Sequence, residues 1–221
     1  MIVSACQGTP APLPGEFRPT ESIMTRINDG AKGWYTRGYL PHFDAGPLRT
    51  QFITFRLFDS LPKKVLHRIK EEIELKDPEN ISRETFMLAE RYLDGGHGEC
   101  FLRLREVASI VKETLLKFDG VRYELYAWVL MPNHAHVLLR PLEGHTYERI
   151  MHSIKSFTAS EANRVLGRKG PFWMREAFDR YIRDDEHFGR AFRYIENNPV
   201  KAGLCEAPGE WEFSSAFGRE N

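Results

Sequence analysis

The chain has 221 residues, of which 42% are hydrophobic and 28% charged, and its formal net charge is zero. This length and composition fit one folded domain with extensions, or at most two small domains. No run approaches the ~18 apolar residues of a membrane span, so a membrane protein is not expected. The three cysteines form no C-x-x-C pair, which argues against a zinc-finger or disulfide scaffold. With no secretory signal at the N-terminus, we expect a cytoplasmic protein.

The charges are unevenly distributed along the chain. Acidic residues concentrate between Glu71 and Glu84, whereas lysine and arginine recur between Lys155 and Lys201. A locally basic surface can serve nucleic acid despite the neutral total. On charge alone, a solvated surface of mixed charge is the simpler interpretation.

The first part of the chain divides into a tail and the start of a fold. Residues 1–33 are rich in proline, glycine and short polar residues, which predicts a flexible N-terminal arm. Residues 34–43 interleave aromatic and cationic side chains, which suits either base stacking with phosphate contact or packing of the rings on the domain. One folded domain is expected over residues 34–216, followed by a tail at 217–221.

Hydrophobic periodicity predicts the regular elements of this domain. Strands are expected at 51–58, 121–130, 134–140 and 178–182, with even alternation along the second of them. Helices are expected at 61–73, 82–92, 101–118, 144–166 and 187–198, the last stopped by Pro199. The glycine cluster at 94–98 lacks the Lys-Ser/Thr pair of a phosphate-binding loop and is predicted to be a turn.

The order of these elements, with the additions set aside, is strand, helices, strand, strand, helix, strand and a final helix. This βαββαβ order predicts an α+β fold of the ferredoxin-like type, an antiparallel sheet with helices packed on one face. The N-terminal arm and a helical insertion around residues 76–100 are extra to that pattern. The two strands of the hairpin 121–140 are expected to be the central ones.

Two histidines stand at the start of the second strand of that hairpin. Because successive side chains of a strand point to opposite faces, His134 and His136 share one face. A helix would separate the two imidazoles by about 200°. As a strand, the segment can offer two ring nitrogens to one metal ion, and a purely structural role is the alternative.

The last predicted helix carries polar side chains beside its apolar stripe. Tyr194 and Asn198 lie one turn apart at the edge of that stripe, and His187 lies two turns earlier on the same flank. A tyrosine at the margin of a core usually packs there with its hydroxyl in water. The spacing gains a functional meaning only if the helix packs over the two-histidine strand.

Several segments together resemble a known family. Residues 131–139, Met-Pro-Asn-His-Ala-His-Val-Leu-Leu, are similar to the HUH motif (His, bulky apolar residue, His) of single-tyrosine transposases, with the small Ala135 at the middle position. Further segments resemble the REP-associated tyrosine transposases within that family, namely 37–42, 170–173, 178–184, 194–204 and 211–215. The resemblance extends over about residues 35–216.

The resemblance implies a transposase-like endonuclease and strand transferase. Such an enzyme cleaves and rejoins single-stranded DNA with hairpin or palindromic elements, through a 5′-phosphotyrosine and with a divalent metal. By position, Tyr194 matches the nucleophile, and His134 and His136 match the metal pair. Asn198 matches the polar residue that completes the site. Relatives include monomers and homodimers, so the oligomeric state stays open.

The family implies Mg or Mn as the metal. Ligand preference alone points elsewhere, because two imidazoles favour Zn, Mn, Co or Ni over Mg. With a neutral amide from Asn198 as the further ligand, the site is expected to bind metal weakly in the absence of DNA. The phenol needs activation, because an unperturbed pKa of ~10 makes it a weak nucleophile at neutral pH.

Residues that suit contacts with DNA are mostly cationic, and each alone is also explained as ordinary surface charge. They are Arg37, Tyr39, His42, Arg168, Lys169, Arg175, Arg180, Arg183 and Lys201. Tyr181 is a rival nucleophile because it lies among cations, but it has no partner at ligand spacing.

Two other functions compete with the transposase hypothesis. One is a catalytically silent DNA-binding protein derived from such an enzyme, and the other an unrelated metallohydrolase.

Overall fold

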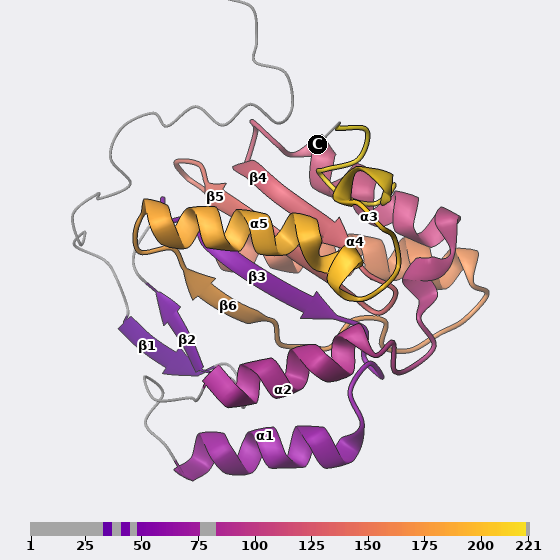
Figure 1. The fold of residues 1–221 in the computed structure, drawn as a ribbon, viewed down its shortest axis with the longest axis horizontal. Coiled ribbons are helices and arrows are strands. Elements are labelled where there is room, and N and C mark those ends of the chain that lie inside the picture. The colour runs from indigo at the N-terminus through magenta and orange to yellow at the C-terminus, as the bar shows by residue number, and fades with distance from the viewer. Residues whose placement is uncertain (1–32, 37–40, 45–47, 76–82, 220–221) are drawn as a thin grey trace, which may run out of the picture.

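Figure 1 shows the fold in a computed structural model of the chain, which describes residues 33–36, 41–44, 48–75 and 83–219. Nearly all of the predicted N-terminal arm, residues 1–32, lies outside the described residues. Among the helices that are described, none is both long enough and apolar enough to cross a lipid bilayer.

A four-stranded antiparallel sheet forms the centre of the fold. In spatial order its strands are β4 (Tyr123–Leu130), β5 (His134–Pro141), β3 (Gln51–Arg56) and β6 (Phe178–Tyr181). This arrangement is that of a ferredoxin-like βαββαβ fold, so the predicted fold class is confirmed. The expectation of two central hairpin strands is wrong for β4, which lies at the sheet edge because β3 pairs with the other side of β5.

The sequence predicted that side chains of β4 alternate evenly between the two faces of the sheet, and this prediction is wrong. The pairing register with β5 shifts between Leu125 and Ala127. As a result Tyr123 and Trp128 pack in the same core, although an even alternation would place them on opposite faces. Tyr123 is fully buried there, and its hydroxyl donates to the carbonyl oxygen of Leu115 at 2.7 Å. The bulge therefore lets apolar side chains from both halves of the strand point into the same core.

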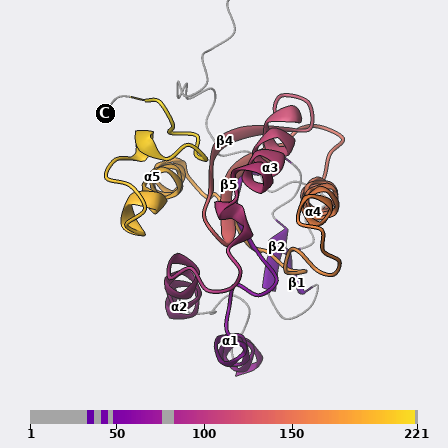
Figure 2. The same ribbon diagram turned by 90° about the vertical axis from the view of Figure 1, so that its right-hand side faces the viewer.

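Helices cover both faces of the sheet, as Figure 2 shows. Helices α3 (Arg105–Lys117) and α4 (Tyr147–Val165) pack on the face that presents Ala135, Val137 and Leu139 of β5. Helix α5 (Asp185–Lys201) packs on the opposite face, against Leu138 and its neighbours. The prediction that helices occupy one face holds for α3 and α4, the helices of the βαββαβ pattern. It is wrong for helix α5, which covers the second face.

The helical insertion predicted around residues 76–100 begins earlier in the chain and forms two helices. They are α1 (Lys63–Leu75) and α2 (Arg83–Asp94), drawn at the bottom of Figure 1. A separate small apolar core joins them, made by Leu61, Val65, Ile69, Ala89 and Leu93. A short 3-10 turn, Phe101–Arg103, then leads into α3, where the sequence predicted one continuous helix.

Helix α5 runs past the proline that was expected to stop it. Asp184 caps its start, accepting from the backbone N–H of His187 at 2.7 Å. Pro199 lies inside the last turn, and the helix continues to Lys201. The turn survives because the N–H groups of Ala202 and Leu204 still bond to carbonyls of residues 198 and 199, so that the proline removes only its own donor.

Two further segments lie beside the main sheet. Strands β1 (Gly33–Thr36) and β2 (Pro41–Asp44) form a separate antiparallel pair in the aromatic stretch of residues 34–43. At the other end, the segment after the 3-10 turn Pro208–Glu210 runs along β4. The N–H of Leu130 donates to the Phe213 carbonyl oxygen at 2.8 Å. Residues 211–215, one of the segments that resemble the family, therefore have a structural role at the sheet edge.

Candidate active site

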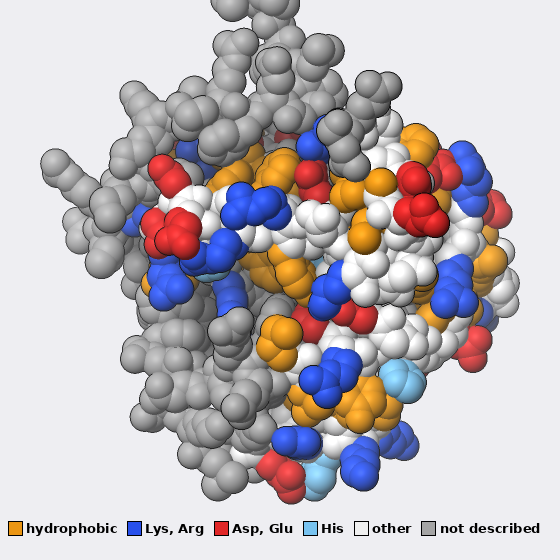
Figure 3. Space-filling model, in the orientation of Figure 1, with side chains coloured by type: hydrophobic (Ala, Val, Ile, Leu, Met, Phe, Trp, Pro, Cys, Tyr) orange, Lys and Arg blue, Asp and Glu red, His pale blue; other side chains and the backbone are white. Residues whose placement is uncertain are grey.

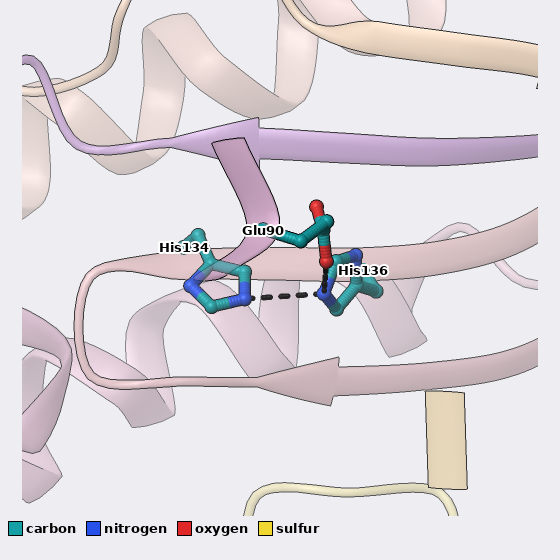
Figure 4. Close-up of side chains that lie close together, drawn as sticks. All are labelled: Glu90, His134 and His136. Atoms are coloured by element: carbon teal, nitrogen blue, oxygen red, sulfur yellow. Dashed lines mark hydrogen bonds and ion pairs between the residues drawn. The ribbon is translucent and has the colours of Figure 1, made fainter. Parts of the chain in front are cut away.

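Strand β5 presents its two histidines to the face covered by α5. Both side chains have 0% exposure, and their Nε2 atoms lie 3.1 Å apart. Figure 4 shows the two side chains next to each other on β5, and their rings meet edge to face. The strand geometry expected from the sequence thus brings the two ring nitrogens close together.

Each histidine is held by a partner on its other ring nitrogen. His134 Nδ1 lies 2.8 Å from Oδ1 of Asn133, whose Nδ2 donates to the His97 carbonyl oxygen at 2.8 Å. Because a carbonyl oxygen only accepts, His134 carries its proton on Nδ1 and its Nε2 has a free lone pair. His136 Nδ1 lies 2.8 Å from the Thr54 hydroxyl, directly across the β3–β5 ladder. Such partners on the far nitrogen are what orients histidines that bind metals.

Helix α5 brings Tyr194 and Asn198 over the same point. Asn198 has 0% exposure, and its Nδ2 lies 3.4 Å from His136 Nε2. The Tyr194 ring meets the His136 ring edge-on, with centroids 5.5 Å apart. The i and i+4 spacing read from the sequence therefore places the phenol and the amide beside the histidine pair. The structure does not bring His187 to this point; it lies at the start of α5, where its Nδ1 contacts the backbone N–H of Arg183.

A carboxylate completes the cluster, and sequence reasoning missed it. Glu90 of α2 is 1% exposed, and the Tyr194 hydroxyl donates a hydrogen bond to its Oε2. The same oxygen lies 3.5 Å from His136 Nε2. A dashed line in Figure 4 marks this contact. One signal was present in the sequence, because helical spacing puts Glu90 four residues after Phe86 and three before Leu93, within an apolar stripe. A carboxylate inside such a stripe needs a partner.

Burial sets the charge of the four groups. It lowers the pKa of His134 from its usual value near 6.5 to about 3. Burial, with His134 alongside, also lowers the pKa of His136. Burial raises the pKa of Glu90 to about 7, although the hydrogen bond from Tyr194 opposes the shift. Burial and the Glu90 carboxylate raise the pKa of Tyr194. At neutral pH both imidazoles are therefore neutral, the form in which histidine binds metals.

The donor set fits a divalent cation. Donor atoms of Glu90, His134 and His136 all lie within 4.8 Å of one another. Ligands bound side by side to one ion at about 2.1 Å lie about 3 Å apart, which is the separation of the two ring nitrogens. Two buried oxygens of the cluster, Asn198 Oδ1 and Glu90 Oε1, have no hydrogen-bond partner among the described residues. Unpartnered buried oxygens beside neutral imidazoles are what a cation site requires.

Comparison with known proteins agrees with this constellation. A family model described as "Transposase IS200 like" matches residues 102–198. A Haemophilus influenzae protein assigned as a REP-associated tyrosine transposase is 30% identical over 122 residues, which are 51% of this chain and 68% of that protein. The chain belongs to the REP-associated tyrosine transposase family. The family match spans both histidines, Tyr194 and Asn198, whereas Glu90 lies outside it.

Solved structures of this family and of another transposase are similar to the chain. A REP-associated tyrosine transposase bound to a REP hairpin gives a TM-score of 0.47 at 21% identity, covering 82% of this chain and 81% of that chain. A transposase of Deinococcus radiodurans gives a TM-score of 0.33 at 17% identity, covering 67% and 89%. The family assignment rests on the sequence matches.

In this member of the REP-associated tyrosine transposase family, the predicted DNA-contact residues come from several segments of the chain. On the face drawn in Figure 3, Lys and Arg side chains are interspersed with Asp and Glu. Arg37 and Tyr39 lie outside the described residues, and so does the side chain of His42 in β2. Lys169, Arg175, Arg180, Arg183 and Lys201 are exposed, and Arg168 is half-buried, with its guanidinium 4.9 Å from the centre of the Phe101 ring.

Lys201, one of these candidate cations, lies beside the Tyr194 ring. Its Nζ lies 5.4 Å from the centre of the Tyr194 ring and 2.7 Å from a carboxylate oxygen of Asp94. The rival Tyr181 is on the edge strand β6, aligned with Gln51 of β3. The strand β3 separates it from the histidines of β5. The structure thus groups Tyr194, and not Tyr181, with the histidine pair.

Proposed function

We propose that this protein cleaves and rejoins single-stranded DNA through a covalent bond to Tyr194. The observation that carries the proposal is the meeting of Tyr194 and Asn198 with the His134–His136 pair at one buried point. Family membership supplies the substrate class, single-stranded DNA with hairpin or palindromic elements. The metallohydrolase alternative leaves the tyrosine without a role and is not supported by this arrangement.

The chemistry is a transesterification at phosphorus. Tyr194 Oη forms a bond to the phosphorus atom, and the bond from phosphorus to the 3′ oxygen breaks. The phenolic proton passes to the Glu90 carboxylate that the hydroxyl already contacts, and the leaving oxygen takes a proton from solvent to become a 3′ hydroxyl. Attack of a 3′ hydroxyl on the phosphotyrosine reverses these steps and rejoins DNA. Because one phosphodiester is exchanged for another, no nucleotide energy source is consumed.

The metal is proposed to be Mg²⁺ or Mn²⁺, with His134, His136 and Asn198 as its ligands. When bound, such an ion stabilises charge on the phosphate and orients it for attack. The protein contributes the neutral state of the histidines and their fixed ring orientation. For Asn198 to bind through oxygen, its amide turns so that the unpartnered Oδ1 replaces Nδ2 beside His136.

Substitution of the two competing tyrosines tests the proposal. Hairpin-bearing single-stranded DNA, labelled at its 3′ end, is incubated with Mg²⁺ or Mn²⁺ and run on a denaturing gel. Wild-type protein and the matched control Tyr181→Phe are expected to form a covalent adduct. Tyr194→Phe is expected to form none, because it lacks the attacking oxygen, while hairpin binding in a mobility-shift assay is unchanged.

Two outcomes would contradict the proposal. An adduct formed by Tyr194→Phe would assign the nucleophile elsewhere. Hairpin binding without an adduct, from wild-type protein in either metal, would instead establish the catalytically silent DNA-binding protein. Removal of the divalent ion with EDTA is expected to abolish the wild-type adduct.

A further inference from the structure

We propose that Glu90, on the inserted helix α2, is the anionic ligand of the metal site, so that the α1–α2 insertion forms part of the active site. This inference rests on the proposed function and extends it with a residue outside the span that the family model matches. The ligand is a divalent cation, and the structure favours Mn²⁺ over Mg²⁺.

The first support is geometric. Glu90 Oε2 lies 3.5 Å from His136 Nε2, and the three candidate donors fall within one 4.8 Å cluster. The carboxylate is 1% exposed, and among the described residues its salt-bridge-distance contact is to the neutral His136 rather than to a lysine or arginine. Its second oxygen, Oε1, is buried without a hydrogen-bond partner. Burying a carboxylate is costly unless it is paired or coordinates a metal, and this one has the geometry for the second.

The second support is the way the insertion is anchored. Ala89 and Leu93 of α2 are buried in the small core shared with α1, on either side of Glu90 in sequence. One helical turn beyond Glu90, Asp94 forms an ion pair with Lys201 of α5 at 2.7 Å. Glu90 is therefore held over the histidines by contacts on its own helix, as a ligand must be.

The insertion also supports the histidines from a second direction. The turn that follows α2 presents the His97 carbonyl oxygen, which accepts from Asn133 Nδ2 at 2.8 Å. Asn133 in turn holds His134 by its other amide atom. The insertion thus supplies one candidate ligand and orients another, which links its position to the integrity of the whole site.

Glu90 changes the expected charge of the metal site. Two neutral imidazoles and an amide attract a dication weakly, which underlies the expectation of weak metal binding without DNA. A carboxylate adds one negative charge when the cation displaces its proton, and it creates a two-histidine, one-carboxylate set that suits Mn²⁺ or Fe²⁺ better than Mg²⁺. The revised expectation is that Mn²⁺ binds the DNA-free protein, and more tightly than Mg²⁺ does. Since Tyr194 donates to the same carboxylate, one side chain connects nucleophile and metal.

Isothermal titration of Mn²⁺ into the full chain, without DNA, tests the role of Glu90. Glu90→Gln keeps the size and loses the charge, and it is expected to weaken Mn²⁺ binding about tenfold or more, because losing even an outer-shell partner costs about 10–100-fold. His136→Ala sets the scale for losing a ligand. Glu71→Gln, an exposed carboxylate on α1, is the matched control and is expected to bind like wild type.

The result that overturns the inference is equal Mn²⁺ affinity in wild type and Glu90→Gln. If Glu90→Gln does not fold, Mn²⁺ affinity is compared between Glu90→Asp and Glu90→Asn, which have the same size and differ in charge. Equal affinities of these two variants also overturn the inference. The proposed function fails separately. A wild-type protein that binds Mn²⁺ through Glu90 but forms no Tyr194 adduct supports the metal ligand and rejects the strand transferase.

Discussion

The two faces of the central sheet are built from the same strands but differ in character. On β5, Ala135, Val137 and Leu139 enter an apolar core against α3 and α4, whereas His134 and His136 meet α5 and α2. The faces are equally buried, so exposure does not distinguish them. What differs is the state of the polar groups they enclose.

On the apolar face, the fully buried hydroxyl of Thr158 has its partners. Thr158 of α4 donates to the Ile154 carbonyl oxygen at 2.7 Å and accepts from Trp173 Nε1 at 2.8 Å. On the histidine face, Asn198 Oδ1 and Glu90 Oε1 have none among the described residues. The α3–α4 face therefore supplies stability, while the histidine face keeps two unsatisfied oxygens that a bound cation would satisfy.

The largest difference between the faces is expected in acid. A histidine whose pKa is lowered on folding stabilises the protein above the unfolded pKa near 6.5 and loses that contribution as pH falls toward the folded value, about 3 for His134. Glu90 has the opposite effect, because its pKa is raised on folding to about 7. It adds to the free energy of unfolding as pH falls from 7 to 4.5. The two histidines outweigh the one glutamate by one proton. The free energy of unfolding is therefore expected to fall by about 1.4 kcal/mol per pH unit between pH 6.5 and 4.5.

Urea unfolding of the metal-free protein at pH 6.5, 5.5 and 4.5 measures this loss. The free energy of unfolding is expected to fall by about 3 kcal/mol over the two pH units, at about 1.4 kcal/mol per pH unit. Glu90→Gln removes the opposing contribution, so its slope is expected to be about twice as steep. A free energy of unfolding that stays flat over this range would mean that the histidines are not held neutral by burial.

A substitution one residue away from His136 tests the apolar face. Val137 has 0% exposure and belongs to the core with α3 and α4. Val137→Ala is expected to lower the free energy of unfolding by about 2 kcal/mol, through lost burial and a residual cavity. Denaturant unfolding measures this loss. Mn²⁺ affinity is expected to stay at the wild-type value, and a parallel fall in affinity would show that the two faces are coupled.

The smallest effect is expected at the rim of the histidine face. The Asp94–Lys201 pair is 14% and 46% exposed on its two side chains, so solvent screens it. Asp94→Asn is expected to cost about 0.5 kcal/mol, and less in 1 M salt. Thermal unfolding at two salt concentrations checks this. A loss of several kcal/mol that salt does not reduce would make this pair the main anchor of α2.

Much of this arrangement could be predicted from the sequence because it follows local periodicity. The facing of His134 and His136 follows from the two-residue period of a strand, and the proximity of Tyr194 and Asn198 follows from the helical turn. Strand order was less accessible, since nothing local says that β3 rather than β4 takes the second central place. The even alternation predicted for β4 failed at a bulge, which inserts one residue and leaves no compositional mark.

Glu90 could not have been placed in the site from the sequence. It is 104 residues from Tyr194 in the chain, and their contact depends on how the α1–α2 insertion docks on α5. Hydrophobic periodicity identifies the buried side of α2 but not what that side meets. The family match could not supply the residue either, because it begins after α2.

The segment along β4 has a consequence for how copies of the chain can associate. An edge strand normally offers free backbone groups to a neighbouring molecule, which is a common route to aggregation. Here the N–H of Leu130 and the carbonyl of Trp128 are already bonded to residues 213 and 215, both at 2.8 Å. Trp211 adds a side-chain bond to the Leu130 carbonyl oxygen at 3.0 Å. A second copy could not lengthen the sheet along this stretch without first displacing residues 211–215.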